Sequence, residues 1–408
     1  MGKLLAATGL MIVLSACGNG NTGTLMGGPN GDSPGSANGG SDPGSPGSGG
    51  TPNGQQGNGS DPNANSNPNI DQRQINYGEA LRTAALKLVG DLPTLADINS
   101  VTDATSYGAM IDKYLADPRF VTRQIQWWRD TLKTGQTGMK TGNGAPSYDT
   151  AATFAAEVVV NDRPFTDILT ASTNTCPTFA SGTFTDASCN NNAPTAGVLT
   201  DPGIMAQYYA NMAFRRVRFI QETFVCSKFP AEFSATPQIM GSGAYTSPWP
   251  FNSITGGSTA KINFQDTSAV ICANCHTTEN HMAPMFGYFD MNGQYTAGKF
   301  QVQVPSQGNP TATLADWLPA SEGFAWRNGK PVKDIPSFAA AMAADPDVQR
   351  CIVTREWNYA MSRGDVVDDV AGVPSVVTDP LLQDFTANGM KVKRLLRNIL
   401  TSDDFVKF

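Results

Sequence analysis

Histidine is scarce in this sequence, and long runs of lysine and arginine are absent. Only two of the 408 residues are histidine, so a zinc site around a pair of cysteines would need further ligands from elsewhere. The 28 lysine and arginine residues are outnumbered by 35 acidic ones, and the net charge is −7. An acidic chain without long basic runs binds nucleic acid and anionic lipid poorly. We therefore expect no nucleic-acid partner.

Long apolar runs are also missing, except for one near the N-terminus. Residues 4–14 are mostly apolar and follow Lys3, which is the pattern of an export signal over residues 1–16. The run is shorter than the roughly 20 apolar residues of a membrane-spanning helix. Residues 14–17 (LSAC) resemble the lipobox of bacterial lipoproteins, in which the cysteine, here Cys17, is acylated after cleavage. The alternative is an ordinary secretory signal with an incidental cysteine.

Lipidation of Cys17 would attach the protein to the cell envelope by its lipid alone. Gly18 follows the cysteine, which favours sorting to the outer membrane if the source is Gram-negative. Residues 17–75 consist largely of glycine, serine, proline and asparagine, and bury too little apolar surface to offset their ordering entropy. We expect a flexible tether there, with a glycosylated or ligand-binding arm as the less favoured alternative.

The rest of the chain shows helical periodicity in most places and no internal repeat. A stretch rich in proline, glycine and serine over residues 231–264 separates a helical region over 76–230 from a second one over 231–408, and the two regions can also form one unit. We expect a mainly α fold with a short strand over 300–304. Helices are expected over residues 77–89, 107–115, 119–132, 163–170, 202–226, 337–344, 347–363, 380–388 and 392–402.

Seven cysteines is an odd number for an exported protein. With Cys17 lipidated and two others assigned below to a cofactor, four are left, and an oxidising compartment favours two disulfides among them. Cys176 and Cys189 flank a polar segment that reads as a loop, which makes them the first pair and leaves Cys226 with Cys351. Four cysteines allow three pairings, so the other two stay open.

Residues 271–276 (ICANCH) contain CxxCH, the attachment signature of c-type haem. On the first turn of a helix, Cys272 and Cys275 reach the two vinyl groups of the porphyrin, and His276 coordinates the iron. A redox dithiol would need a βαβ context, and half of a zinc site would need more ligands. We expect one covalent haem c on an irregular helical domain with disulfide-linked loops.

The ligand on the opposite side of the iron is not fixed by the sequence. His281 is the only other histidine, and its separation of five residues from His276 would require an unusual loop. Met282, Met285 and Met361 are further candidates, although methionine on a buried helix is more often part of the core. An open or water-bound position is another alternative.

The expected helix over 347–363 contains two arginines, Arg355 and Arg363, that could bind the propionate groups of a haem. A solvent-exposed helix face explains both more simply, so we expect them at the surface.

The segment that follows CxxCH resembles one found in large cytochrome c-like proteins of planctomycetes and of groups similar to myxobacteria. Residues 272–290 (CANCHTTENHMAPMFGYFD) are similar to the segment CxxCH…DPxGFxxENFD of that family, and Asn280 and His281 stand where the family has Asp-Pro. The likeness continues through the residues FDMNG, which end at Gly293.

Other segments carry the same resemblance more faintly. Residues 215–230 resemble the family's paired-arginine helix, residues 348–363 its cysteine-containing helix, and residues 392–405 its terminal helix. Residues 88–128 are similar to a unit with a Gly-Leu-Pro-x-Thr turn and an Asp-Pro-Arg-Phe helix. The resemblance implies a helical haem protein in which the cysteines at positions 226 and 351 are structural, and it implies no substrate.

These observations favour a monohaem c-type cytochrome that passes single electrons between redox proteins of the envelope. A haem enzyme, either peroxidase-like or an oxidoreductase subunit, is the first alternative, although c-haem peroxidases usually have a second haem and only one CxxCH occurs here. A surface binding protein with a structural haem is the second. We expect an electron carrier rather than a catalyst.

Overall fold

The fold was analysed in a computed structural model. It describes residues 73–134, 145–189, 193–209, 213–227, 270–298, 323–365 and 370–408, together with four short strands between them; over 270–277 and in those strands only the backbone is described. The predicted signal peptide, Cys17 and the tether up to residue 72 lie outside these ranges. Residues Gln74–Phe408 form one compact unit.

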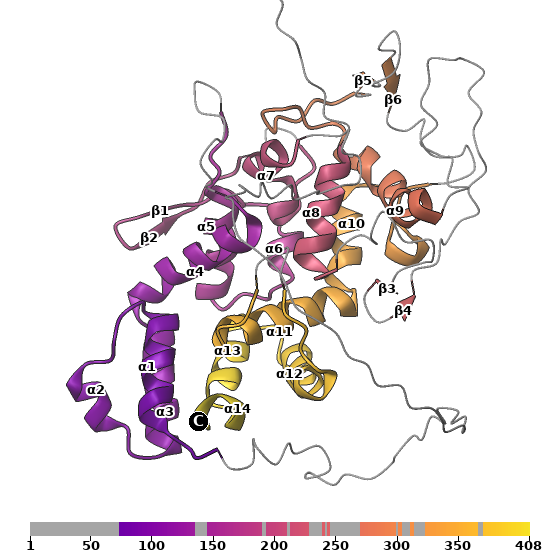
Figure 1. The fold of residues 1–408 in the computed structure, drawn as a ribbon. Helices are drawn as coiled ribbons and strands as arrows, with labels where there is room; N and C mark the ends of the chain where they lie inside the picture. The colour runs from indigo at the N-terminus through magenta and orange to yellow at the C-terminus, as the bar shows by residue number, and fades with distance from the viewer. Residues whose placement is uncertain are drawn as a thin grey trace, which may run out of the picture. The chain divides into compact units, whose positions relative to one another are not determined.

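The compact unit is mainly helical, as predicted (Figure 1). Its helices are α1 (Tyr77–Leu88), α2 (Leu95–Ser100), α3 (Ala104–Leu115), α4 (Pro118–Leu132), α5 (Thr150–Val160), α6 (Asp167–Thr170), α7 (Pro202–Gln207), α8 (Phe214–Phe224), α9 (Val270–Phe286), α10 (Ile335–Ala343), α11 (Pro346–Ala360), α12 (Ser375–Ala387), α13 (Val392–Leu400) and α14 (Asp403–Val406), with short 3-10 turns η1 (Gly197–Thr200) and η4 (Arg327–Gly329). None of the helices in the described ranges is long and apolar enough to cross a membrane.

The strands are short and pair only with their neighbours in sequence. Each of the four sheets has two antiparallel strands. The strands are β1 (Thr178–Ala180), β2 (Thr183–Thr185), β3 (Ile239–Met240), β4 (Gly243–Ala244), β5 (Gln301–Gln303), β6 (Thr311–Thr313), β7 (Ala325–Trp326) and β8 (Lys330–Pro331).

Helix starts follow local capping chemistry. The Asp103 side chain accepts from the backbone N–H of Ser106, and the Ser106 hydroxyl receives the N–H of Asp103 in return, which begins α3. The same reciprocal pair begins α10, with Asp334 and Ser337. These contacts satisfy backbone donors that have no partner inside the helix. They explain why the boundaries lie within a few residues of those expected.

Helix α5 was not among the expected helices, although it lies at the centre of the core. Its residues between Thr150 and Val160 are all buried, so its apolar side chains point in every direction. A helix that is apolar all round has no amphipathic period by which a sequence pattern can identify it. Helix α5 contacts α4, α6, α7, α13 and η1.

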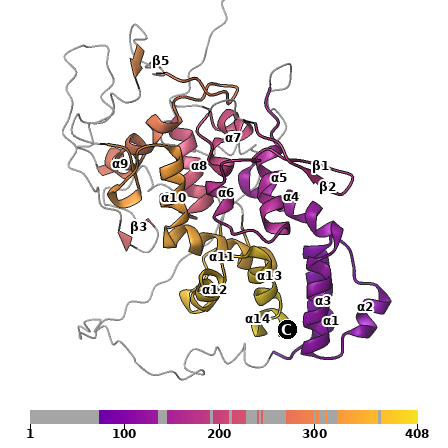
Figure 2. The ribbon, with the colours of Figure 1, turned by 180° about the vertical axis from the view of Figure 1, so that it is seen from behind.

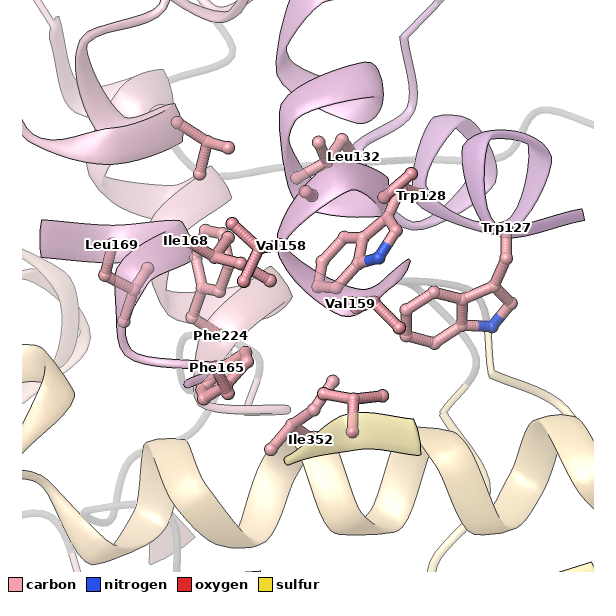
Figure 3. Close-up of a cluster of buried hydrophobic side chains, with 14 of the residues drawn as sticks. Trp127, Trp128, Leu132, Val158, Val159, Phe165, Ile168, Leu169, Phe224 and Ile352 are labelled. Carbon is pink, nitrogen blue, oxygen red and sulfur yellow. The ribbon is translucent and has the colours of Figure 1, made fainter. Parts of the chain in front are cut away.

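The core around α5 brings together helices from both halves of the chain. Figure 3 shows Trp128 of α4, Val158 of α5, Phe224 of α8 and Ile352 of α11 directed into one interior, and all four side chains are buried. The helical regions before and after residue 230 therefore share a single hydrophobic core.

Two further expectations are corrected. The single helix expected over 202–226 is two helices, α7 and α8, because Ala213 has a left-handed backbone with φ of 70°, which a continuous α-helix does not allow. The expected loop after Cys176 contains the hairpin β1–β2. Its turn is formed by Ser181 and Gly182, whose φ values of 51° and 80° suit a two-residue turn between twisted strands.

Both predicted disulfides are present. Cys176–Cys189 lies at the base of the β1–β2 hairpin, and its Cα atoms are 5.4 Å apart. Cys226–Cys351 joins the end of α8 to α11, again with 5.4 Å between the Cα atoms. The first disulfide fastens a local hairpin, whereas the second links segments 125 residues apart.

The two ends of the compact unit are paired. The backbone N–H of Gln74 donates to the carbonyl of Phe408, and the N–H of Phe408 donates back, both at 3.0 Å. The N–H of Asn76 donates to the carbonyl of Val406. The first and last residues of the unit therefore lie side by side.

Candidate functional site

The CxxCH motif lies in the first two turns of α9, a continuous helix from Val270 to Phe286. Positions 272, 275 and 276 are spaced by three and four residues, which places them on one side of an α-helix. Two cysteines and a histidine on one side of a helix are the donor set that a covalent haem c needs. The backbone here therefore fits the attachment of this group.

The same helix turns the nearby ligand candidates away from position 276. His281 follows His276 by five residues, which turns it about 140° around the helix axis. Met282 and Met285 follow by six and nine residues and lie about 120° and 180° away. All three are buried, His281 with only 1% of its surface exposed. A helix continues where a loop would be needed to turn His281 back toward position 276. Met282 follows position 275 by seven residues and so lies on the side of the helix that carries that position, whereas His281 and Met285 do not.

Met361 lies elsewhere in the unit. It follows the last turn of α11, where the Tyr359 hydroxyl donates to the carbonyl of Lys87 and the Tyr359 ring packs against Trp127. This end of α11 is therefore next to α1 and α4. Figures 1 and 2 place α1 and α9 at opposite ends of the unit. The structure does not bring Met361 to the attachment helix.

The C-terminal end of α9 is held by a buried arginine from α8. Arg216 is only 1% exposed, and its guanidinium donates to the carbonyls of Phe286 (2.6 Å), Phe289 (3.0 Å) and Asp290 (3.1 Å). It also donates to the carbonyl of Met205 in α7, from two nitrogens at 2.6 and 3.0 Å. Carbonyls at helix ends lack donors within the helix, and a cation there also interacts favourably with the helix dipole. Arg216 therefore fixes α9 to both α7 and α8.

Burial lowers the pKa of Arg216 to about 10, so its guanidinium is still charged at neutral pH. The loss of hydration is offset by five hydrogen bonds to carbonyl oxygens, which is the compensation that a buried cation requires.

The turn after α9 is shaped to pack on the start of α7. The Asp290 carboxylate accepts from the backbone N–H groups of Asn292 and Gln294, each at 2.8 Å. Gly293 has φ of 71°, and a Cβ atom there would lie 2.0 Å from the carbonyl oxygen of Pro202. Only glycine fits this turn.

A second buried arginine, Arg355, caps α8, although we expected it at the surface. Arg355 is 1% exposed rather than at the surface, because its guanidinium donates to the last carbonyls of α8, those of Glu222 (3.3 Å) and Thr223 (3.1 Å). It also donates to the carbonyl of Asp365. Arg363 is exposed, as expected.

Three segments that are distant in sequence thus form one frame around α8. Arg216 of α8 holds α9, Arg355 of α11 holds α8, and the Cys226–Cys351 disulfide closes the same junction. Sequence reasoning noted the arginine motifs but not their function in the frame. The available signal was an arginine at a position that the helical period places among the apolar residues of its helix.

Glu356, next to Arg355, is a buried acid without a partner. It has no exposed surface, and neither carboxyl oxygen has a hydrogen-bond partner. Burial, and then the negative charge of Asp365, raise its pKa well above the ordinary value, and the charge of Arg355 opposes this only in part. The site therefore favours the protonated form of Glu356 over the carboxylate.

We expect Glu356→Gln to reduce the loss of stability as pH rises. A raised native pKa means that the folded state holds a proton that the unfolded chain releases above its own pKa, so stability falls as pH rises from that value toward the native pKa. The glutamine cannot lose a proton, so the variant should lose less stability than the wild type between pH 5 and pH 8. The measurement is the free energy of urea unfolding at pH 5 and pH 8. The control is Glu79→Gln, at an exposed site, and equal slopes for the two variants would contradict the prediction.

The fold and site define a mainly helical, disulfide-linked protein with a CxxCH helix held by buried arginines. Residues 64–215 match the model of a family described as PSCyt2, a protein of unknown function (DUF1549), which is a planctomycete-associated domain. The matched residues include α1–α7 and end immediately before Arg216, so α9 lies outside the match. No curated protein and no solved structure matches the chain.

Proposed function

We propose that this protein is a monohaem c-type cytochrome that passes single electrons at the bacterial cell envelope, with haem c on Cys272, Cys275 and His276. The observation that supports this most is the position of CxxCH in the first turns of α9, whose other end is fixed by Arg216. Bound haem supplies reversible one-electron exchange. The chain contributes the two thiols, the axial imidazole and a rigid frame for the helix that carries them.

The proposal includes a lipid anchor on Cys17 at the outer membrane and redox proteins of the envelope as partners. The supporting observations are the LSAC sequence and the stretch rich in glycine, serine, proline and asparagine that follows a short export signal. The mature full-length protein should carry diacylglycerol on Cys17 by mass spectrometry, and Cys17→Ser should lack it. A signal-cleaved but unmodified wild type would contradict the anchor.

The decisive experiment is expression of the full chain together with a c-type haem maturation system. The wild type should keep one haem per chain after denaturation, with the reduced spectrum of a c-type haem. Replacing Cys272 and Cys275 by alanine should abolish the covalent haem, whereas the same change at Cys176 and Cys189 should leave it. A wild type without covalent haem would overturn the proposal.

A haem enzyme is a second candidate because of one observation. The described ligand candidates on α9 are turned away from the side of His276, and Met361 lies near α1. An iron without a second protein ligand is suited to binding and activating small molecules. Carbon monoxide should bind rapidly to the reduced protein in that case, whereas a six-coordinate electron carrier should resist it.

A further inference from the structure

The Cys176–Cys189 disulfide has a buried carboxyl group beside it. The Cys176 Sγ lies 3.4 Å from Oδ2 of Asp201, and both sulfurs and the carboxylate lie within 4.8 Å of one another. Cys176 is 4% exposed and Asp201 1%, while Cys189 is partly exposed. Cys189 is therefore the more exposed residue of the pair, and the sulfur of Cys176 faces an acid in the interior.

Asp201 is held in place by neutral partners only. Its Oδ1 accepts from the backbone N–H of Ile204 at 3.0 Å, which caps α7, and its Oδ2 accepts from the Thr150 hydroxyl at 2.6 Å. Burial raises the pKa of Asp201 to about 6, although the hydrogen bonds from Thr150 and Ile204 act in the other direction. A carboxyl group of this kind can hold or release a proton near neutral pH.

A cleft of about 330 Å³ lies beside this cluster. Its lining includes Pro177, Thr178 and Phe179, which follow Cys176, and Thr150 of α5, whereas neither cysteine nor Asp201 lines it. Thr178 is exposed, and Thr150 is the residue whose hydroxyl donates to Asp201. The hydroxyl thus links the buried carboxyl group to the cleft.

We propose that Cys176–Cys189 is a redox-active disulfide that exchanges with an external dithiol, with Asp201 as the proton donor to Cys176. The thiolate of the dithiol attacks the Sγ of Cys189, the more exposed residue, and the S–S bond breaks with its electron pair on Cys176 Sγ. The Asp201 carboxyl group transfers its proton to that sulfur. The second thiol of the partner then attacks the partner's own sulfur in the mixed disulfide, closes the partner's disulfide and releases Cys189, whose thiolate takes up the proton of that second thiol. The proton that the first thiol lost to solvent restores Asp201. The protein gains two electrons and two protons, and the dithiol loses them.

The Cys226–Cys351 disulfide has different surroundings from those of Cys176–Cys189. The sulfurs of Cys226 and Cys351 lie near backbone carbonyls, those of Cys351 and Thr223, each at 3.5 Å. Among the residues that the structure describes, no acidic or imidazole group joins these two cysteines in a similar cluster. Within the described part of the chain, no such group is placed to protonate a leaving thiolate of this disulfide, and we expect it to exchange more slowly.

The test is reduction of the folded full-length protein with dithiothreitol, followed by alkylation and mass spectrometry of each cysteine pair. In the wild type, Cys176–Cys189 should be reduced faster than Cys226–Cys351. The rate of reduction of Cys176–Cys189, corrected for the fraction of dithiothreitol that is thiolate, should fall as pH rises through about 6. The reason is that Asp201 loses the proton that it donates to Cys176.

Asp201→Asn should slow this reduction about tenfold at pH 5.5 and remove the fall near pH 6. Asp117→Asn is the matched control, since Asp117 also caps a helix before a proline, far from either disulfide in sequence. Asp201→Ser keeps a capping oxygen without an ionisable group, and serves if the asparagine variant fails to fold. Equal rates for the two wild-type disulfides, or Asp201 variants that match Asp117→Asn, would overturn the proposal.

Discussion

Replacing Arg216 by methionine is expected to lower the free energy of unfolding by about 3 kcal/mol or more. The change keeps the apolar bulk but removes five hydrogen bonds, and it leaves the carbonyls of Phe286 and Met205 buried without these donors. Each such group costs about 1–3 kcal/mol. Because Arg216 fixes the end of α9, the yield of covalent haem should fall together with stability. Urea unfolding and haem content per chain are the two measurements.

The neighbouring arginine provides the control for this prediction. Arg215 is exposed, and its guanidinium lies 5.7 Å from the centre of the Tyr208 ring. Such an exposed contact contributes about 0.5–1 kcal/mol, so Arg215→Met should change stability by no more than that. Similar losses for the two variants would mean that Arg216 does not hold the frame.

Removing the Cys226–Cys351 disulfide by alanine substitution should cost about 5 kcal/mol. The bond closes a loop of 125 residues, and the entropy that a cross-link removes from the unfolded chain grows with loop length. The Cys176–Cys189 bond closes a separation of 13 residues, and its removal should cost about 3 kcal/mol. The free energy of urea unfolding for each double-alanine variant gives the comparison. A larger loss from the shorter loop would contradict the prediction.

The helices that could be predicted are those with one apolar face. Helix α13 was expected over 392–402 and spans Val392–Leu400, because Leu395, Leu396 and Ile399 recur at helical spacing and are buried. Helix α5 lacks such a face and was missed. The break between α7 and α8 depends on the backbone of Ala213, which the residue type does not reveal.

The local part of the candidate site could be predicted from the sequence, but its contacts with distant segments could not. The CxxCH motif is local, so it could be recognised in the sequence. The hydrogen bonds of Arg216 could not be predicted from the sequence. The carbonyls that it contacts on α9 and in the following turn are 70 to 74 residues away, and because every residue has a carbonyl, the residue types do not mark these partners. The arrangement of His281 depended on whether a loop or a helix followed the motif, and the structure has a helix.

The pairing of the two ends of the compact unit has a mechanical consequence. A pull along the N-terminal segment would enter the unit at Gln74, where the first bonds to carry the load are those to Phe408 and Val406. Phe405 and Val406 of α14 pack in the hydrophobic core beside these bonds, so such a pull would load α14 first. Helix α9 makes none of these bonds, so the helix with the CxxCH motif is not the first element to bear the load.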